Sequence, residues 1–220
     1  MPSSARKCID SWRKILPDYK IQEWNDGNFD VNIIPYTRDA YAAGKYAFVS
    51  DYARFWVLYH QGGLYFDTDV EVIRPLDDIV SKGAFMGFEV DDVRRKDLPP
   101  SVAPGLGLGV EAGHPLYAEI LKRFEQLSYY MPDGTRNTFT MVPMVTQLLK
   151  EKGLVLEDKQ QTVAGVTVYP NEFFNPFDDI TGIMRKTENT RTIHWYAKTW
   201  TDNNRPWLVK LKRYIRRQLM

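Results

Sequence analysis

Two acidic residues, Asp67 and Asp69, stand out in this sequence as side chains whose type and spacing could do chemistry. They lie two positions apart, directly after the apolar run at residues 64–66. On a regular strand such residues point to opposite faces, but a turn after the strand can bring both carboxylates to one cation. Carboxylate oxygens suit Mg²⁺ and Mn²⁺, which also bind phosphate oxygens. The pair therefore predicts either a divalent metal site or, alternatively, a solvated turn.

Asp51 and Arg54 form a second charged pair shortly before these two residues. They lie three positions apart within residues 49–61, where aromatic and apolar residues recur at helical spacing. Because residues three apart share one face of a helix, both side chains face the same way. Taken alone, such a pair is also typical of a surface salt bridge worth a few tenths of a kcal/mol.

A longer pattern surrounds these charged residues. Ser-Asp-Tyr-Ala-Arg at residues 50–54 is followed by Gly-Gly-Leu-Tyr-Phe-Asp-Thr-Asp at residues 62–69 and by an apolar run that ends at Pro75. This pattern closely resembles the sugar-binding Asp-x-Asp region of glycosyltransferase family 32, which is related to the glycosylating domains of large clostridial toxins and to yeast mannosyltransferases. Further stretches, among them residues 8–12 and 194–200, extend the resemblance over roughly residues 5–200.

The resemblance implies a role for each matching residue. It implies a GT-A fold and retaining transfer of a sugar from a nucleotide-diphosphate donor, with Mn²⁺ or Mg²⁺ as cofactor. Asp67, Asp69 and His194 would hold the ion, and Asp51, Arg54 and Asp69 would act in catalysis. The implied donor-binding residues are Ser50, Asp51, Arg54, Tyr65, Asp67, Asp69, Thr199 and Trp200. A cation is needed because departure of the diphosphate builds negative charge, which an ion stabilises without proton transfer. For His194 a purely structural role at a strand end is the alternative.

The elements that must position these residues follow from apolar spacing and from Gly and Pro positions. Helices are expected over residues 5–16, 37–44, 49–61, 115–128 and 141–152. Strands are expected over residues 19–24, 64–66, 70–73, 84–89, 106–111, 167–169 and 192–195. Residues 91–104 mix charges with prolines and indicate a surface loop.

This alternation favours an α/β domain with one mixed, mostly parallel central sheet flanked by helices. Ligands of such sheets bind beyond the carboxyl ends of strands, which is where Asp67 and Asp69 are expected. Members of family 32 usually begin with a strand of the type Ile-Pro-Lys-Ile-Ile-His, and this chain starts after it. We therefore expect a GT-A fold lacking the usual first strand, with a catalytic domain over residues 1–204 and a basic amphipathic helix over residues 205–220.

For several other residues that stand out in the sequence, we expect structural roles or roles outside catalysis. The glycines of residues 105–109 lack the spacing of a dinucleotide fingerprint, and they indicate either close backbone approach on the acceptor side of the cleft or a simple turn. His60 is expected to end its helix, and His114 to open the next one. The single cysteine, Cys8, excludes an intramolecular disulfide and is expected to be a buried thiol.

The charge and hydropathy of the chain limit the classes of partner that we expect. The net charge is +1, but six of the 29 basic residues lie in residues 205–220, so the rest of the chain carries about −5 and nucleic acid is an unlikely partner. We expect no membrane span and no signal peptide, and therefore a cytoplasmic protein. The basic segment either contacts the inner face of the plasma membrane or docks on the protein's own body.

These observations predict a glycosyltransferase of the hexosyltransferase class. The expected donor is a nucleotide sugar, with UDP-sugars first, and the expected acceptor is a glycan or lipid-linked saccharide in polysaccharide or lipopolysaccharide synthesis. The main alternative is a non-catalytic carbohydrate- or partner-binding domain, or a truncated inactive transferase of the same fold. A metal-dependent phosphoesterase is a weaker alternative, because such enzymes gather more ligands for two metals.

Overall fold

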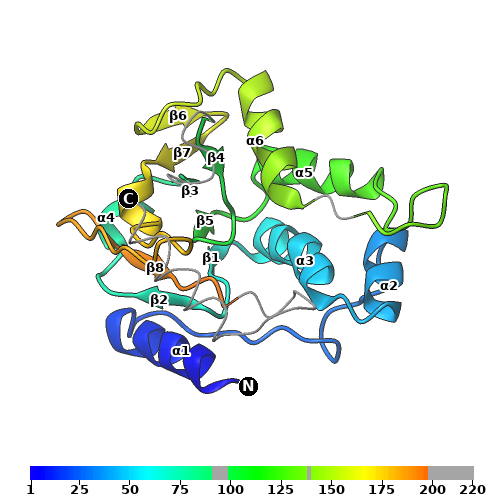
Figure 1. The fold of residues 1–220 in the computed structure, drawn as a ribbon, viewed down its shortest axis with the longest axis horizontal. Helices are drawn as coiled ribbons and strands as arrows, with labels where there is room; N and C mark the ends of the chain where they lie inside the picture. Colours follow the sequence, from blue (N-terminus) through cyan, green and yellow to red (C-terminus); the bar gives the residue numbers. More distant parts are fainter. Residues whose placement is uncertain (91–98, 138–139, 198–220) are drawn as a thin grey trace.

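A computed structural model of the chain describes residues 1–90, 99–137 and 140–197. Helices and strands alternate along these ranges (Figure 1). The helices are α1 (Ser3–Ile15), α2 (Pro35–Ala42), α3 (Tyr46–Gln61), α4 (Asp77–Val80), α5 (Pro115–Glu125), α6 (Met141–Glu151) and α7 (Asn171–Phe174). The strands are β1 (Gly63–Tyr65), β2 (Val70–Val72), β3 (Phe85–Glu89), β4 (Ser101–Val102), β5 (Leu108–Val110), β6 (Gln161–Val163), β7 (Val166–Tyr169) and β8 (Thr192–His194).

The central sheet has the strand order β1-β5-β3-β7-β6, with β4 added along β3. β5 runs antiparallel to both β1 and β3, and β3 runs parallel to β7. β1, β3 and β7 therefore point the same way, and their carboxyl ends lie at one edge of the sheet. Asp67 and Asp69 follow β1 at that edge, as the sequence predicts.

A separate two-stranded ladder carries the segment after the acidic residues. β2 pairs antiparallel with β8, which places Val70 opposite His194. Helix α1 packs on this ladder: the indole Nε1 of Trp12 donates to the carbonyl of Val70 at 2.7 Å, and the N–H of Val72 donates to Ser11 Oγ at 2.9 Å. The strand after Asp69 is therefore fixed on both sides, by β8 and by α1 (Figure 1).

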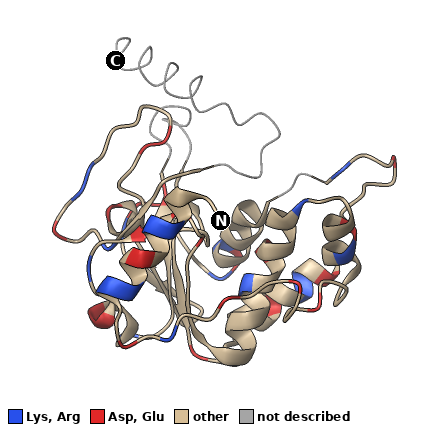
Figure 2. Cartoon of the chain, turned by 90° about the horizontal axis from the view of Figure 1, so that it is seen from below, with Lys and Arg blue, Asp and Glu red and all other residues tan. Residues whose placement is uncertain are grey.

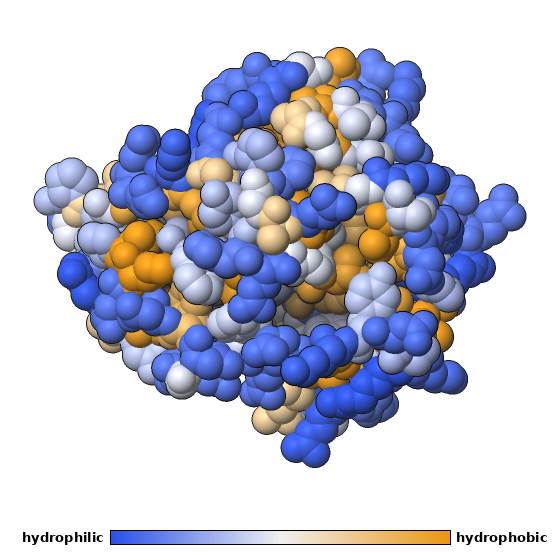
Figure 3. Space-filling view, turned by 180° about the vertical axis from the view of Figure 1, so that it is seen from behind, coloured by the Kyte–Doolittle hydropathy of each residue, from blue (hydrophilic) through white to orange (hydrophobic). Residues whose placement is uncertain are grey.

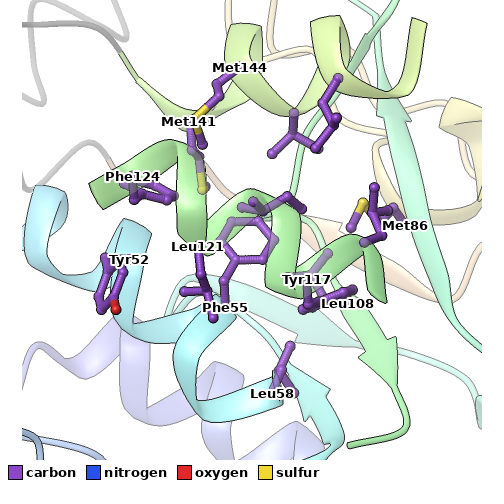
Figure 4. Packing of buried hydrophobic residues seen from close by; sticks show 14 of the residues in the cluster. Tyr52, Phe55, Leu58, Met86, Leu108, Tyr117, Leu121, Phe124, Met141 and Met144 are labelled. Atoms are coloured by element: carbon purple, nitrogen blue, oxygen red, sulfur yellow. The ribbon is translucent and has the colours of Figure 1, made fainter. Parts of the chain in front are cut away.

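The larger core lies between the central sheet and helices α3, α5 and α6 (Figure 4). Phe55 on α3 is fully buried, and its ring contacts those of Tyr117 and Phe124 on α5. Met141 and Met144 on α6 close the same cluster. Because aromatic rings bury large apolar areas, this packing makes α3 a rigid support for the polar residues on its other face.

A second core cluster lies on the other side of the sheet. Met86 and Phe88 of β3 point into the larger core, whereas Phe85 points into the second, as expected for the alternating side chains of a strand. Gly87 shares the side of Phe85, and a Cβ there would lie only 2.7 Å from the ring of Phe174. Glycine thus lets α7 pack directly on the central strand.

The five helices predicted within the described residues are confirmed with small shifts in their ends, whereas three predictions about strands and loops are wrong. Residues 19–24 form no strand, since no neighbouring strand of the described chain offers them hydrogen bonds. Residues 101–102, expected in a loop, form β4; residues 91–98 of that loop lie outside the described residues. The sheet is mixed, but β3–β7 is the one parallel pair within the described ranges, so it is not mostly parallel.

The short elements α4, α7 and β6, of three or four residues each, were not predicted. The first strand along the described chain is β1, which follows three helices. The predicted helix over residues 205–220 lies outside the described residues.

The surface of the described protein is largely polar. Lys and Arg residues are interspersed with Asp and Glu along the helices and loops (Figure 2). Hydrophilic side chains cover most of the face opposite to that of Figure 1, with smaller apolar patches between them (Figure 3). Across the described helices, none combines the length and the apolar composition needed to cross a membrane.

Candidate active site

The two acidic residues lie in the connection between β1 and β2. The N–H of Val70 donates to the carbonyl of Asp67 at 2.9 Å, so the chain turns between the two strands. This turn brings both carboxylates to one side, where they meet His194, the last residue of β8. One ligand atom from each of Asp67, Asp69 and His194 can be chosen so that all three lie within 4.8 Å of one another. The predicted grouping of these three residues is thus present.

The first half of the site, which we call the α3–β1 half, comprises Asp51, Arg54, Tyr65 and Asp67. Helix α3 places Asp51 and Arg54 on one face, and the Arg54 side chain is only 3% exposed. Its Nη2 donates to Asp51 Oδ1 at 3.0 Å, and its Nη1 forms an ion pair with Asp67 Oδ1 at 3.0 Å. The interpretation of this pair as a surface salt bridge is therefore wrong, because the guanidinium is buried between two carboxylates.

Two further contacts fix Arg54 in the α3–β1 half. Its Nε donates to the carbonyl of Ser50 at 3.1 Å, and its guanidinium carbon lies 4.7 Å from the centre of the Tyr65 ring. The hydroxyl of Tyr65 donates to Asp67 Oδ1 at 3.0 Å. A buried cation needs partners of this kind, and two of the residues concerned, Arg54 and Tyr65, contact Asp67 Oδ1.

Burial and charge set the protonation of this half. Burial raises the pKa of Asp51 to about 6, because the attraction of Arg54 offsets only part of the desolvation and Asp67 adds repulsion. Burial alone would lower the pKa of Arg54, but Asp67, Tyr65 and Asp51 raise it overall. The guanidinium therefore stays charged, and Asp51 is the group of this half that titrates near neutral pH.

The second half of the site, the β2–β8 half, comprises Asp69, His194 and the two residues that hold them, Tyr196 and Ala197. His194 Nε2 lies 3.1 Å from Asp69 Oδ1, and the N–H of Ala197 donates to Asp69 Oδ2 at 2.7 Å. Burial raises the pKa of Asp69, but these two hydrogen bonds outweigh it, so the pKa is lowered. Burial lowers the pKa of His194, and Asp69 reverses this and raises it.

The residues present fit a divalent cation. Two carboxylates and one imidazole form a donor set that such ions accept, leaving further positions for phosphate oxygens. The chosen ligand atoms of the three residues lie within 4.8 Å of one another. Two ligands on opposite sides of an ion with bonds of about 2.1 Å would be roughly 4.2 Å apart, so small movements of the side chains would suffice to bind one. His194 Nδ1 is buried and has no hydrogen-bond partner among the described residues.

Gly105 is a site residue whose contact the sequence did not identify. A Cβ at this position would lie 2.3 Å from Asp67 Oδ2, and the N–H of Asp67 points to the carbonyl of Gly105 at 3.4 Å. The backbone at Gly105 does approach a site residue closely, but that residue is Asp67, and the predicted approach to the acceptor side of the cleft stays a prediction. The run of glycines in the sequence suggested a close backbone contact, but only the fold shows that its partner is Asp67.

Of the predicted site residues, seven are brought together by the two halves: Ser50, Asp51, Arg54, Tyr65, Asp67, Asp69 and His194. Thr199 and Trp200 lie outside the described residues. Gly105, Tyr196 and Ala197 complete the described site without having been predicted.

The other two histidines and the cysteine belong to the scaffold, as predicted. His60 lies in the last turn of α3 with Nδ1 2.8 Å from the carbonyl of Trp56. His114 caps α5, and its side chain accepts a hydrogen bond from the N–H of Leu116. Cys8 is buried in α1, and burial raises the pKa of its thiol to about 11.

Comparisons with known proteins agree with this geometry. Residues 2–86 match the family described as the glycosyltransferase sugar-binding region containing a DXD motif. This match contains α1, α2, α3, β1 and β2 together with both acidic residues. Residues 2–86 are thus similar to this family of glycosyltransferases, in agreement with the resemblance to family 32 found in the sequence. The mixed sheet with flanking helices agrees with a GT-A type fold.

Three curated relatives transfer mannose according to their names. A mannosyl phosphorylinositol ceramide synthase of Saccharomyces cerevisiae is 29% identical over 133 residues, which cover 58% of this chain and 32% of the relative. A second such synthase of that yeast is 30% identical over 129 residues, covering 57% and 30%. Inositol phosphoceramide mannosyltransferase 3 of Schizosaccharomyces pombe is 25% identical over 130 residues, covering 57% and 33%. The chain thus spans about a third of the length of these relatives, and no solved structure matches it significantly.

Proposed function

We propose that this protein is a metal-assisted glycosyltransferase that moves a hexose from a nucleoside-diphosphate donor to a lipid-linked acceptor, with retention at the anomeric carbon. The observation that carries the proposal is the convergence of Asp67, Asp69 and His194, next to a buried Arg54, at the carboxyl edge of the sheet. The DXD family match supports the donor class, and the resemblance to family 32 supports retention.

The chemistry places the largest charge change on the leaving diphosphate. The anomeric C–O bond breaks with its electrons going to the phosphate oxygen, and the acceptor hydroxyl oxygen bonds to the anomeric carbon while its proton passes to the departing diphosphate. A divalent ion, Mn²⁺ or Mg²⁺, would supply the positive charge that stabilises the departing diphosphate. Asp67, Asp69 and His194 would hold it, with the two aspartates kept in place by neighbours that the structure shows.

Arg54 would act in two ways in this mechanism. Its ion pairs with Asp51 and Asp67 hold the ligand carboxylate in a fixed orientation before any substrate arrives. Such preorganisation is effective because no rearrangement has to occur when charge develops in the transition state. Asp51, on the exposed side of the pair at 13% exposure, is the residue of this half placed to accept a hydrogen bond from a sugar hydroxyl.

The relatives refine the expected substrates. Their names give mannose as the transferred sugar and inositol phosphoceramide as the acceptor. We therefore propose mannose as the first donor sugar to test beside the UDP-sugars, and a lipid-linked acceptor before a soluble glycan. We also propose that the protein works at the cytoplasmic face of a membrane, since residues 205–220 combine six basic residues with apolar ones.

The test is hydrolysis and transfer with a panel of UDP- and GDP-sugars in the presence and absence of Mn²⁺. Acceptors are an inositol phospholipid, a lipid-linked saccharide and a lipopolysaccharide core. Metal-dependent turnover of one donor, lost in Asp69→Asn and kept in Asp10→Asn, is the expected result. Asp10 is a matched control because it pairs with Arg13 on the exposed face of α1. Absence of turnover with every donor, in folded protein, would favour the carbohydrate-binding alternative.

A further inference from the structure

Tyr196 has a backbone conformation that is uncommon for its residue type. Its φ is +50°, and Ala164 is the other non-glycine residue with positive φ in the described part of the chain. Such conformations are unfavourable for a non-glycine residue and persist where the surrounding structure holds them. Here the turn comes two residues after His194 and brings the N–H of Ala197 to 2.7 Å from Asp69 Oδ2.

The side chain of Tyr196 turns back onto the other metal-ligand candidate of this half. Its ring centre lies 4.1 Å from that of the His194 imidazole, with 54° between the planes. The tilted ring therefore packs closely against the imidazole and limits its rotation. One residue thus supports both ligands of the β2–β8 half, His194 through its ring and Asp69 through the turn of its backbone.

The hydroxyl of Tyr196 is itself anchored at two points. It lies 2.7 Å from Glu89 Oε1 and 2.9 Å from Asn175 Oδ1. A hydroxyl has one hydrogen, so it donates to the Glu89 carboxylate and accepts from Asn175 when that amide presents its NH₂ group. Burial, then Glu89, raises the pKa of Tyr196 well above its usual value, so the hydroxyl keeps its hydrogen.

Both anchors belong to the rigid part of the fold. Glu89 is the last residue of β3, the central strand, and Asn175 directly follows α7, which packs on β3. Asn175 is only 5% exposed, so a water molecule cannot easily take the place of the Tyr196 hydroxyl as its hydrogen-bond partner. The network therefore ties the segment after β8 to the centre of the sheet.

We propose that Tyr196 is a positioning residue for the metal site, with Glu89 and Asn175 as its anchors. It holds the imidazole of His194 and the carboxylate of Asp69 in the orientation needed to bind a divalent ion. This inference rests on the proposed metal-assisted function and adds residues to it. Partners that orient metal ligands typically change metal affinity by 10–100-fold when they are removed.

The test is the affinity for Mn²⁺ of Tyr196→Phe, measured by isothermal titration calorimetry on the full chain without substrate. The substitution removes one oxygen and leaves the ring on His194. Tyr41→Phe is the matched control, since the Tyr41 hydroxyl also donates to a carboxylate, that of Asp26 at 2.6 Å, on an exposed surface. We expect about tenfold or greater weakening in Tyr196→Phe and less than twofold in Tyr41→Phe.

A second variant keeps the test independent of any general loss of stability. Glu89→Gln preserves the volume of the side chain and removes the charge that orients the Tyr196 hydroxyl. If both residues act through one hydrogen bond, the double variant Glu89→Gln/Tyr196→Phe should weaken Mn²⁺ binding by less than the product of the two single fold-changes. Unchanged affinity in Tyr196→Phe, or independent effects of the two substitutions, would overturn this inference while leaving the metal site intact. Wild-type protein that binds no Mn²⁺ would instead overturn the metal-assisted function, and this inference with it.

Discussion

The two halves of the candidate site are assembled over very different distances along the chain. In the α3–β1 half, Asp51, Arg54 and Asp67 lie within one helix–strand unit and meet around a buried guanidinium. In the β2–β8 half, Asp69 and His194 are 125 positions apart and meet because β2 pairs with β8. The ion pairs of the first half are therefore made between residues close in sequence, whereas the second half requires the pairing of two distant strands.

The two halves also hold their carboxylates by different means. Asp67 is held by an ion pair and a tyrosine hydroxyl, and Asp69 by an imidazole and a backbone N–H. Asp67 thus depends on charge, while Asp69 depends on strand register and on the turn at Tyr196. Substitutions in the two halves should therefore disturb the positions of the two carboxylates by different mechanisms.

The largest effect is expected from Asp69→Asn, which removes a charged ligand and leaves its shape. Loss of a metal ligand should lower kcat/KM by on the order of 10³, since the ion supplies several kcal/mol of charge stabilisation. The Asn side chain still accepts from Ala197, so the fold should be kept. Steady-state kinetics with circular dichroism measures both, and near wild-type turnover would remove the β2–β8 half from the mechanism.

Gly105→Ala tests the α3–β1 half without changing any charge. The new Cβ would lie 2.3 Å from Asp67 Oδ2, so either the carboxylate or the backbone must move. A misplacement of about 1 Å can cost on the order of 10²-fold in rate, and we expect a loss of that size with weaker Mn²⁺ binding. Kinetics and calorimetry check this. If Gly105→Ala has the same reaction rate and the same Mn²⁺ affinity as the wild type, the close contact between Gly105 and Asp67 does not contribute to function.

Asp51→Asn separates stability from function in the α3–β1 half. The pKa of Asp51 is raised from 3.8 to about 6 in the folded protein, so ionisation costs stability as the pH rises through that range. Relative to the wild type, Asp51→Asn should gain up to about 3 kcal/mol in unfolding free energy between pH 4 and pH 7. Urea unfolding of metal-free protein at a series of pH values measures this. A difference that is constant with pH, or that falls, would contradict the assignment.

Trp195→Phe should have the smallest effect, although its neighbours in sequence are His194 and Tyr196. The Trp195 side chain is 40% exposed, and its indole donates to Glu71 at 3.0 Å, away from the ligands. Loss of this hydrogen bond should lower the unfolding free energy by about 0.5–1.5 kcal/mol, while Phe keeps a ring against Phe177. Thermal unfolding measures the change. A loss of Mn²⁺ affinity as large as that in Gly105→Ala would show that the whole segment, rather than Tyr196, positions the ligands.

The same contrast between local and distant contacts explains which features could be predicted from the sequence. Helix α3 was predicted because Tyr52 and Phe55 recur at helical spacing, and the charged residues on it were placed by that helix. Residues 19–24 have the composition of a strand, but a strand forms only where another strand accepts its hydrogen bonds, and sequence does not show that neighbour. β4 was missed for the opposite reason, since its two residues form a strand only through β3.

Within the site, the resemblance to a family indicated the candidate ligands, whereas the residues that support them were not predicted. Asp67, Asp69 and His194 fall on matching motif positions. Tyr196 acts through a positive φ and through contacts with Glu89, 107 positions away, neither of which leaves a local pattern. Gly105 was flagged as a glycine in a run of glycines, and only the packing against Asp67 gives it a role.

The most direct test of the shared metal site is the anomalous difference density of crystals grown with Mn²⁺ and a nucleoside diphosphate, collected at the manganese edge. The account predicts one peak within bonding distance of Asp67, Asp69 and His194, with the diphosphate on the open side of the ion. A peak held elsewhere, or an ion bound by the α3–β1 half alone while His194 remains on Asp69, would contradict the claim that the two halves meet in one metal site.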